Sequence, residues 1–296
     1  MSEKHQPDLS RGLVDVETLA RHFREPGWRV VDCRFDLMNP DAGEQEWRQG
    51  HVPGAVHAHL DRVLSSPVTP QSGRHPLPDL PAFVDWLGRE GIDEHTRVVA
   101  YDDSLSMYAS RLWWLLRMLG HEQVAVLDGG WSAWREAGLP VDAEPSRPEA
   151  RVYRPRNPIR RFEEAAVVDA QAVERNIGHG DFLLVDVRTA ERYRGEAEPI
   201  DPVAGHVPGS VNLPLTENVD ERGFFHSPQT LRELYAPLYR SHPAERQAYL
   251  CGSGVSACQP LLAQHAAGLG LPLLYAGSWS EWIRDPNRPV ATGEQP

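Results

Sequence analysis

Cysteine is scarce in this chain, and the other absences also narrow the class of protein. The 296 residues include three cysteines, too few for a disulfide framework. Cys33 and Cys258 are best interpreted as small buried thiols. No Cys/His cluster has the spacing of a zinc site, so we expect no metal and no cofactor. No apolar run reaches membrane-spanning length, and the polar N-terminus lacks a signal-peptide core, which favours the cytoplasm.

The chain also has fewer basic than acidic residues. The chain carries 30 Lys and Arg against 42 Asp and Glu, a formal net charge of −12. This balance argues against nucleic-acid binding, and any anionic substrate must rely on local positive groups. The apolar fraction of 41% and nine tryptophans indicate a globular protein. The length suits one large domain or two ordinary ones.

What the sequence does contain is a duplication. Gly50–Val56 returns as Gly205–Val211 with six of seven residues identical. Three more pairs of similar segments follow the same order, at 30–34 and 184–188, 98–102 and 247–251, and 128–134 and 276–282. A period of about half the chain indicates two copies of one domain. We place the domains at residues 11–143 and 164–293, joined by a proline-rich linker at 144–163.

Within each copy, short β-rich runs alternate with helical patterns. We predict strands at 28–32, 98–101, 124–127, 183–186, 247–250 and 273–275. We predict helices in the first copy at 16–23, 81–89, 108–119 and 131–137. Such alternation predicts an α/β fold with a central, mainly parallel sheet flanked by helices in each domain. Ligands of these sheets bind beyond the carboxyl ends of the strands, where Cys251 stands.

The residues around Cys251 form the most informative stretch. The cysteine follows an apolar run, and Gly252 and Gly254 come within the next three residues, before a helical pattern. Backbone N–H groups of such a loop can point inward, and a helix N-terminus adds partial positive charge. The loop therefore favours the thiolate of Cys251, which is the nucleophilic form.

Together these features resemble the rhodanese family of sulfurtransferases. The resemblance rests on the paired Gly-His-Val-Pro-Gly segments, the Asp-x-Arg strand ends, the closing Gly-Gly-Trp and Gly-Ser-Trp segments, and a cysteine loop in the second copy only. It covers nearly the whole chain and implies tandem rhodanese-like domains, the first catalytically silent and the second catalytic. Asp102 stands where the second copy has Cys251, and a carboxylate cannot accept sulfur.

The resemblance implies transfer of a sulfane sulfur. The Cys251 thiolate would take sulfur from a small donor and become a persulfide, and an acceptor such as thioredoxin, another thiol or cyanide would remove the outer sulfur. Thiosulfate-type members tend to carry basic residues after the cysteine, where this chain has Gly252 and Ser253. The loop is similar to the 3-mercaptopyruvate type. The residues expected to bind the donor from this loop are Gly252, Gly254, Val255 and Ser256.

The 3-mercaptopyruvate type also implies a relay. Ser253 would act with a histidine and an aspartate of the first domain, and the matching positions are His75 and Asp61. Such a relay would supply general acid–base catalysis beside the sulfur. The alternative is that Ser253 is only a small loop residue and His75 only a loop histidine.

One expected arginine is present and another is missing. Arg192 matches the family's principal carboxylate-binding arginine, whose fork can hold a carboxylate bidentately. Arg188 suits a structural role, and Arg194 is ambiguous. The mercaptopyruvate type has a second arginine where this chain has Ile200 or Asp201. Because that clamp is missing, as in thiosulfate-type members, thiosulfate stays the alternative donor.

Two other functions are alternatives to sulfur transfer. A phosphatase of the related dual-specificity type needs an arginine after five intervening residues, and that position is Ala257. A non-enzymatic sulfur-relay or binding module is also possible, although the intact Cys251 loop argues against an inert role. Since two fused domains already make a cleft, we expect a monomer with small-molecule donors and no nucleic-acid or membrane partner.

Overall fold

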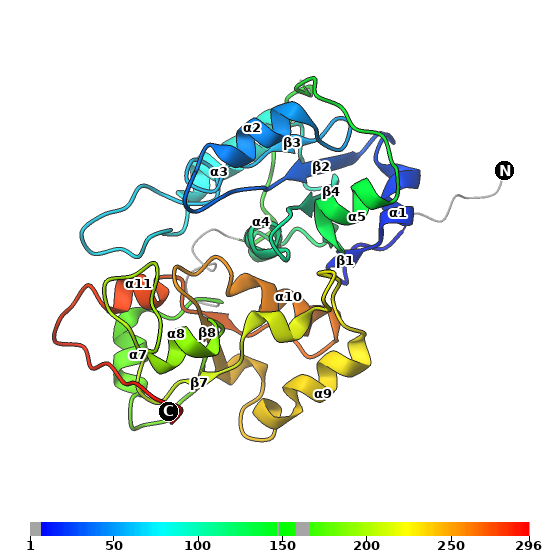
Figure 1. Ribbon diagram of the computed structural model, residues 1–296. Coiled ribbons are helices and arrows are strands. Elements are labelled where there is room, and N and C mark those ends of the chain that lie inside the picture. Colours follow the sequence, from blue (N-terminus) through cyan, green and yellow to red (C-terminus); the bar gives the residue numbers. More distant parts are fainter. Residues whose placement is uncertain (1–6, 147, 158–165, 296) are drawn as a thin grey trace.

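The computed structural model describes residues 7–146, 148–157 and 166–295, which form two α/β halves (Figure 1). In Figure 1 the N-terminal half lies above the C-terminal half, and each has a sheet with helices packed around it. The domain boundaries stay predictions. Residues 147 and 158–163 of the predicted linker lie outside the described residues.

A parallel sheet with the strand order β1-β5-β4-β2-β3 forms the centre of the N-terminal half. Its strands are β1 (Leu13–Val14), β2 (Trp28–Asp32), β3 (Val56–His57), β4 (Arg97–Tyr101) and β5 (Val124–Leu127). The helices of this half are α1 (Val16–His22), α2 (Ala42–Gln49), α3 (Leu80–Arg89), α4 (Met107–Met118) and α5 (Gly130–Glu136).

The C-terminal half repeats this topology with the strand order β7-β6-β8-β9. Its strands are β6 (Leu183–Asp186), β7 (Val211–Asn212), β8 (Gln247–Leu250) and β9 (Leu273–Leu274). Its helices are α7 (Ala170–Asn176), α8 (Ala190–Arg194), α9 (Pro228–Tyr239), α10 (Cys258–Ala266), α11 (Ser278–Trp282) and the 3₁₀ turns η1 (Leu215–Asn218) and η2 (Ala244–Arg246). Val167 bridges to Leu274 in parallel, in the place that β1 holds beside β5.

Local sequence explains where these elements form. Strands β5 and β8 are buried along their whole length, which suits short apolar runs in a sheet covered on both faces. Helix α1 begins after Asp15, whose carboxylate accepts the N–H of Thr18 at 2.7 Å. Helix α3 begins after Asp79, which caps Ala82 in the same way at 2.9 Å. The predicted α/β class and parallel sheets are therefore confirmed, and the predicted ends of elements shift by at most one residue.

Each half contains an equivalent buried ion pair between an aspartate at the end of a strand and the arginine two residues later. Arg34 donates to the Asp32 carboxylate at 2.6 Å and to the Gly50 carbonyl at 2.7 Å. Arg188 repeats this arrangement with Asp186 at 2.7 Å, and a tryptophan ring faces each guanidinium. Both pairs follow the Asp-x-Arg strand ends. The geometry agrees with the structural role expected for Arg188.

The two halves share one hydrophobic core. Helix α4 faces α10 where the halves meet (Figure 1). Trp113 and Leu112 of α4 belong to the same buried cluster as Leu261 and Leu262 of α10. This apolar contact fixes the halves relative to each other, so side chains from both can build one site. No helix within the described residues is long and apolar enough to cross a membrane.

The loop after β4 is filled by its own carboxylate. Asp102 is 1% exposed and accepts four backbone N–H groups, those of Ser104, Ser106, Tyr108 and Ala109, at 2.8 to 3.0 Å. Burial raises the pKa of Asp102 to about 6, against the effect of these hydrogen bonds. In the first copy, the position equivalent to the cysteine therefore organises the loop.

Replacing this carboxylate should destabilise the fold. Asp102→Ala leaves four backbone N–H groups without a partner, two of them buried and two partly buried, so we expect the free energy of unfolding to fall by about 3 kcal/mol. Chemical denaturation measures the change. The control is Asp103→Ala, which removes the neighbouring exposed carboxylate and should change stability by less than about 0.5 kcal/mol. Equal stability of the two variants would contradict this role for Asp102.

Candidate active site

The loop between β8 and α10 encloses the sulfur of Cys251. The residue is 2% exposed, and the N–H of Gly254 is directed at Sγ with an N–S distance of 3.1 Å. Ser278 Oγ accepts the N–H of Cys251 at 3.1 Å, and the Cys251 carbonyl accepts the N–H of Trp279 at 3.0 Å. Among the described residues this Gly254 N–H is the one backbone donor that bonds to the sulfur. It stabilises negative charge there.

Gly254 is required by the backbone itself. Its φ is +78°, in the left-handed region that favours glycine. A Cβ at this position would lie 2.0 Å from the carbonyl oxygen of Ala276. The tight loop that aims an N–H at the sulfur therefore depends on a glycine here.

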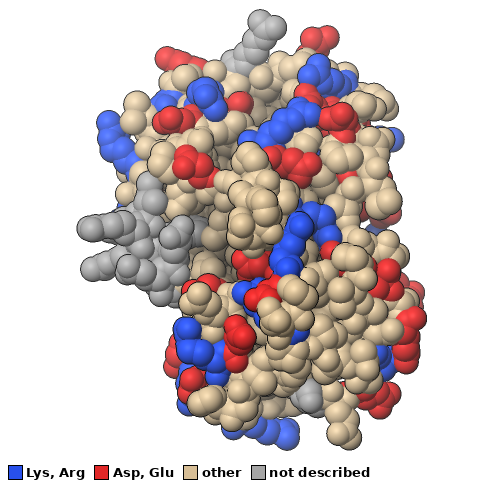
Figure 2. Space-filling model, turned by 90° about the vertical axis from the view of Figure 1, so that its left-hand side faces the viewer, with Lys and Arg blue, Asp and Glu red and all other residues tan. Residues whose placement is uncertain are grey.

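A cavity of about 320 Å³ lies at the carboxyl ends of the strands and is lined by residues of both halves. The predicted site residues that line it are His75, Arg192, Gly252, Ser253, Val255 and Ser256. Acidic and basic side chains are interspersed on the face of the molecule in Figure 2, without a field of one sign. The positive groups available to an anion in the cavity are the three arginines that line it, Arg74, Arg188 and Arg192.

The structure brings the three relay residues together across the two halves. His75 Nδ1 lies 2.8 Å from Ser253 Oγ, and His75 Nε2 lies 3.4 Å from Asp61 Oδ1. Burial lowers the pKa of His75, although Asp61 opposes this effect, and the contact with His75 lowers the pKa of Asp61. A neutral imidazole with its Nε2 proton directed at Asp61 can accept the Ser253 hydroxyl through Nδ1. The arrangement can move a proton beside the cysteine loop.

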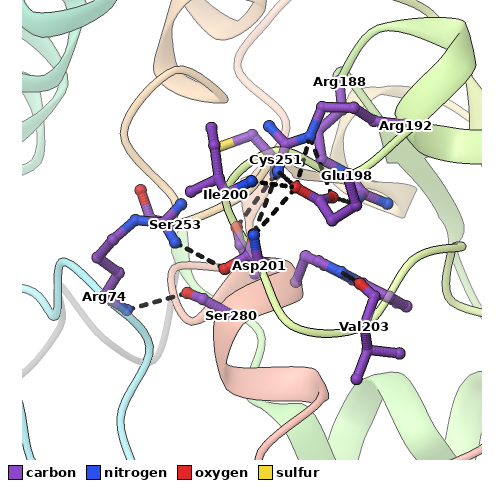
Figure 3. Close-up of polar contacts among 12 residues, drawn as sticks. Arg74, Arg188, Arg192, Glu198, Ile200, Asp201, Val203, Cys251, Ser253 and Ser280 are labelled. Carbon is purple, nitrogen blue, oxygen red and sulfur yellow. Dashed lines mark hydrogen bonds and ion pairs between the residues drawn. The ribbon is translucent and has the colours of Figure 1, made fainter. Parts of the chain in front are cut away.

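Arg192 lies in the cavity wall and is held by two carboxylates. Its Nε donates to Glu198 at 3.1 Å, and its Nη2 donates to Glu198 at 2.7 Å and to Asp201 at 3.1 Å (Figure 3). Arg194, which the sequence left ambiguous, pairs instead with Glu196 at 2.8 Å. Of these two arginines, Arg192 is the one placed to meet a substrate.

A buried cation that was not predicted from the sequence lies behind the loop. Arg111 of α4 is 0% exposed and donates from Nη1 to the carbonyl of Gly254 at 3.2 Å. It is close enough to interact electrostatically with Cys251 and Cys258. In the sequence, the signal for this side chain was an arginine at the start of the mainly apolar stretch 111–119. This guanidinium supports the loop and favours negative charge on the sulfur.

The other two cysteines, Cys33 and Cys258, are also free and buried. Burial raises the pKa of Cys258 to about 12 and also raises the pKa of Cys33. These values agree with the interpretation of both as buried thiols. Within the part of the chain that the structure describes, no group of three or more His, Cys, Asp or Glu residues could hold a metal ion.

Comparison with known proteins decides the family. The model of the rhodanese-like domain matches residues 15–137 and 169–285, one match in each half. The chain belongs to the rhodanese family. It is a tandem rhodanese-domain sulfurtransferase of the 3-mercaptopyruvate/thiosulfate type.

Its relatives in the rhodanese family include both donor types. A probable 3-mercaptopyruvate sulfurtransferase of Pseudomonas aeruginosa is 42% identical over 287 residues, covering 96% of this chain and 99% of the relative. A thiosulfate sulfurtransferase of Cricetulus griseus is 35% identical over 299 residues, covering 97% of both. The solved structure of 3-mercaptopyruvate sulfurtransferase from Leishmania major superimposes with a TM-score of 0.81 at 30% identity, covering 94% of this chain and 76% of that one.

The sulfur-carrying residue can be tested directly. Protein exposed to a sulfur donor should gain one sulfur atom at Cys251, which intact-mass and peptide mass spectrometry would detect. Cys251→Ser should gain none while keeping its fold, because the hydroxyl is not a comparable nucleophile. The control Cys33→Ala, in the other half, should still be loaded. Added sulfur on the Cys251→Ser variant would place the persulfide elsewhere.

Proposed function

We propose that this rhodanese moves a sulfane sulfur from 3-mercaptopyruvate to a thiophilic acceptor through a persulfide of Cys251. The observation that supports this donor is the contact of His75 with Ser253 and Asp61 beside the cysteine loop. 3-Mercaptopyruvate is a thiol whose proton has to move during the reaction, whereas thiosulfate transfers sulfur without a proton. A proton relay therefore assists transfer from 3-mercaptopyruvate and is not needed for transfer from thiosulfate.

In the first half-reaction the thiolate of Cys251 attacks the donor sulfur. The new S–S bond forms as the C–S bond breaks, and the electron pair of the C–S bond becomes the enolate of pyruvate. The proton from the donor thiol must then reach the enolate carbon to give pyruvate. Ser253 and His75 can carry that proton, and Asp61 stabilises the imidazolium in between. The persulfide remains as an anion.

In the second half-reaction an acceptor attacks the outer sulfur and regenerates the thiolate. Thioredoxin, another thiol or cyanide would serve, and the two steps give ping-pong kinetics. Carbon–sulfur cleavage also needs the donor held in place, and Arg192 in the cavity wall is proposed to bind its carboxylate.

Transfer from thiosulfate is the second candidate function. It is favoured by the lack of an arginine at Ile200 and Asp201, one of which stands where the mercaptopyruvate type carries its second arginine; Ile200 lines the cavity. A non-enzymatic relay module is the third candidate.

The donor assignment is tested by measuring kcat/KM for 3-mercaptopyruvate and thiosulfate side by side. We expect the value for 3-mercaptopyruvate to be at least about tenfold higher, a difference of about 1.4 kcal/mol in transition-state stabilisation. A higher value for thiosulfate would make the second candidate correct. Absence of transfer from either donor would favour the relay module.

The relay is tested by Ser253→Ala. Loss of the hydroxyl should lower kcat with 3-mercaptopyruvate about a hundredfold, because proton transfer loses its path. Turnover of thiosulfate by the same variant is the control and should change less than about threefold. In the wild type, turnover of 3-mercaptopyruvate should fall only below the ordinary histidine range near pH 6.5, since the pKa of His75 is lowered. Equal losses with both donors would reject the relay.

A further inference from the structure

A second cavity lies at the amino ends of β2 and β4, at the other edge of the N-terminal sheet from the loop of Asp102. Its volume is about 490 Å³, and none of its lining residues lines the cavity beside the cysteine loop. Three arginines line it, namely Arg24, Arg29 and Arg151. In a chain of net charge −12, three arginines around one hollow indicate a site for negative charge.

The fold produces such a hollow in both halves, but with different side chains. The turn Pro53–Gly54 of this cavity corresponds to Pro208–Gly209 in the repeat, and that turn lines a cavity of about 300 Å³ in the C-terminal half. The described residues that line the C-terminal hollow include no arginine or lysine, and its ionisable side chains are His179 and His242. The three arginines are therefore a feature of the first copy and do not follow from the duplicated architecture.

Arg29 crosses the floor of the N-terminal cavity with little contact to acceptors. Its Nη1 lies 3.4 Å from the carbonyl oxygen of Gly54, and its Nη2 would lie 3.0 Å from a Cβ added to Gly91. Its Nε is buried without a hydrogen-bond partner, and no carboxylate of the described residues forms an ion pair with it. Burial lowers the pKa of Arg29, and the charge of Arg151 acts in the same direction, whereas Glu90 opposes both. An anion in contact with this guanidinium would relieve an unfavourable charge.

Arg151 reaches the same cavity from the predicted linker. Its backbone N–H donates to the Gly88 carbonyl at 2.8 Å, and its Nη1 donates to Asp93 at 2.9 Å. These contacts hold the linker against the N-terminal half. Arg29 and Arg151 are close enough for their charges to repel each other. The backbone therefore keeps two like charges side by side at the cavity wall.

The two carboxylates that also line the cavity have other partners. Glu25 Oε2 lies 3.1 Å from His22 Nδ1, and Asp142 accepts the N–H of Glu144 at 3.0 Å. Within the described part of the chain, neither carboxylate forms an ion pair with one of the three arginines. The positive charge of the lining is therefore available to a ligand.

We propose that this cavity binds a tetrahedral oxyanion, such as a phosphate or sulfate group, between Arg29 and Arg151. Planar guanidinium forks match the oxygens of such a group, which can accept one N–H from each arginine. The cavity is larger than the ion alone, and Pro26 and Trp28 in its wall leave an apolar surface for the organic part of an ester. None of these residues takes part in the proposed sulfur transfer, so the site is a second one.

Site-resolved hydrogen exchange tests the cavity with inorganic phosphate as the probe. About 10 mM phosphate should slow amide exchange about threefold or more in peptides covering residues 23–29 and 148–154, relative to sodium chloride of equal ionic strength. Peptides covering residues 188–194 and 251–257 report separately on phosphate in the cavity beside the cysteine loop. Unchanged exchange at residues 23–29 of the wild type would overturn the proposal.

Arg29→Gln is the decisive variant, because it removes the charge and keeps a side chain of similar length. Phosphate affinity measured from exchange at residues 23–29 should fall about tenfold or more, and Arg29→Lys should retain part of it. The control is Arg222→Gln, which removes an exposed guanidinium outside the cavity and should change this affinity by less than about twofold. Equal affinity of the wild type and Arg29→Gln would contradict the assignment.

A second variant and a second probe complete the test. Arg151→Gln removes the more exposed arginine, keeps the proposal testable if Arg29→Gln fails to fold, and should weaken phosphate binding about fivefold or more. Ribose 5-phosphate is compared with phosphate in the wild type. Tighter binding of the sugar phosphate would identify an ester as the ligand, and equal or weaker binding would identify the free ion. Turnover of both sulfur donors by Arg29→Gln should stay within about twofold, so failure of the proposed sulfur transfer leaves this test unaffected.

Discussion

Both halves of this rhodanese depend on the same kind of tight loop. In each loop, backbone N–H donors are directed at the side chain that follows a central strand. After β4 the loop closes on the carboxylate of Asp102, and after the equivalent strand β8 it closes on the sulfur of Cys251. In both loops the carbonyl of this residue accepts the N–H of a tryptophan, Trp131 or Trp279. The duplicated fold therefore presents one anion-holding loop twice. A carboxylate there organises the loop, whereas a cysteine there offers a nucleophile that fits the proposed transfer of sulfur.

The N-terminal half is part of the candidate site. It contributes His75 and Asp61 to the proposed relay and Arg111 to the support of the cysteine loop. A 2.8 Å contact between His75 and Ser253 requires the halves to be fixed within a fraction of an ångström. The shared core between α4 and α10 supplies that rigidity, since packed apolar interiors resist displacement. Hydrophobic packing between the halves is thus what makes acid–base chemistry beside the sulfur geometrically possible.

Six of the nine strands in the described residues could be predicted from the sequence, because most of these six are apolar runs buried along most of their length. Strands β1, β3 and β7 were not predicted, since two residues each are too few to show a pattern. Helix α2 was missed because it buries only Gly43 and Trp47, too few positions for a helical period. Arg74 could not be interpreted because its partner Asp201 lies 127 residues away, in the other half. Local sequence patterns predict helices and strands. The role of a polar side chain depends on which atoms the tertiary structure places next to it.

Charge pairing accompanies the entry of Arg74 from the N-terminal half into the cavity wall. Three arginines of the cavity wall pair with three carboxylates behind them in one connected network, formed by Arg74, Arg188, Arg192, Asp186, Glu198 and Asp201. In a chain of net charge −12, such pairing lets cations be buried without a large desolvation penalty. A basic residue at position 252 would meet the same forks and repel them, because its Cβ alone would approach Arg74 Nη2 to 3.0 Å. A glycine at position 252 is therefore matched to the guanidinium groups of Arg74 and Arg192, which lie where a side chain would begin.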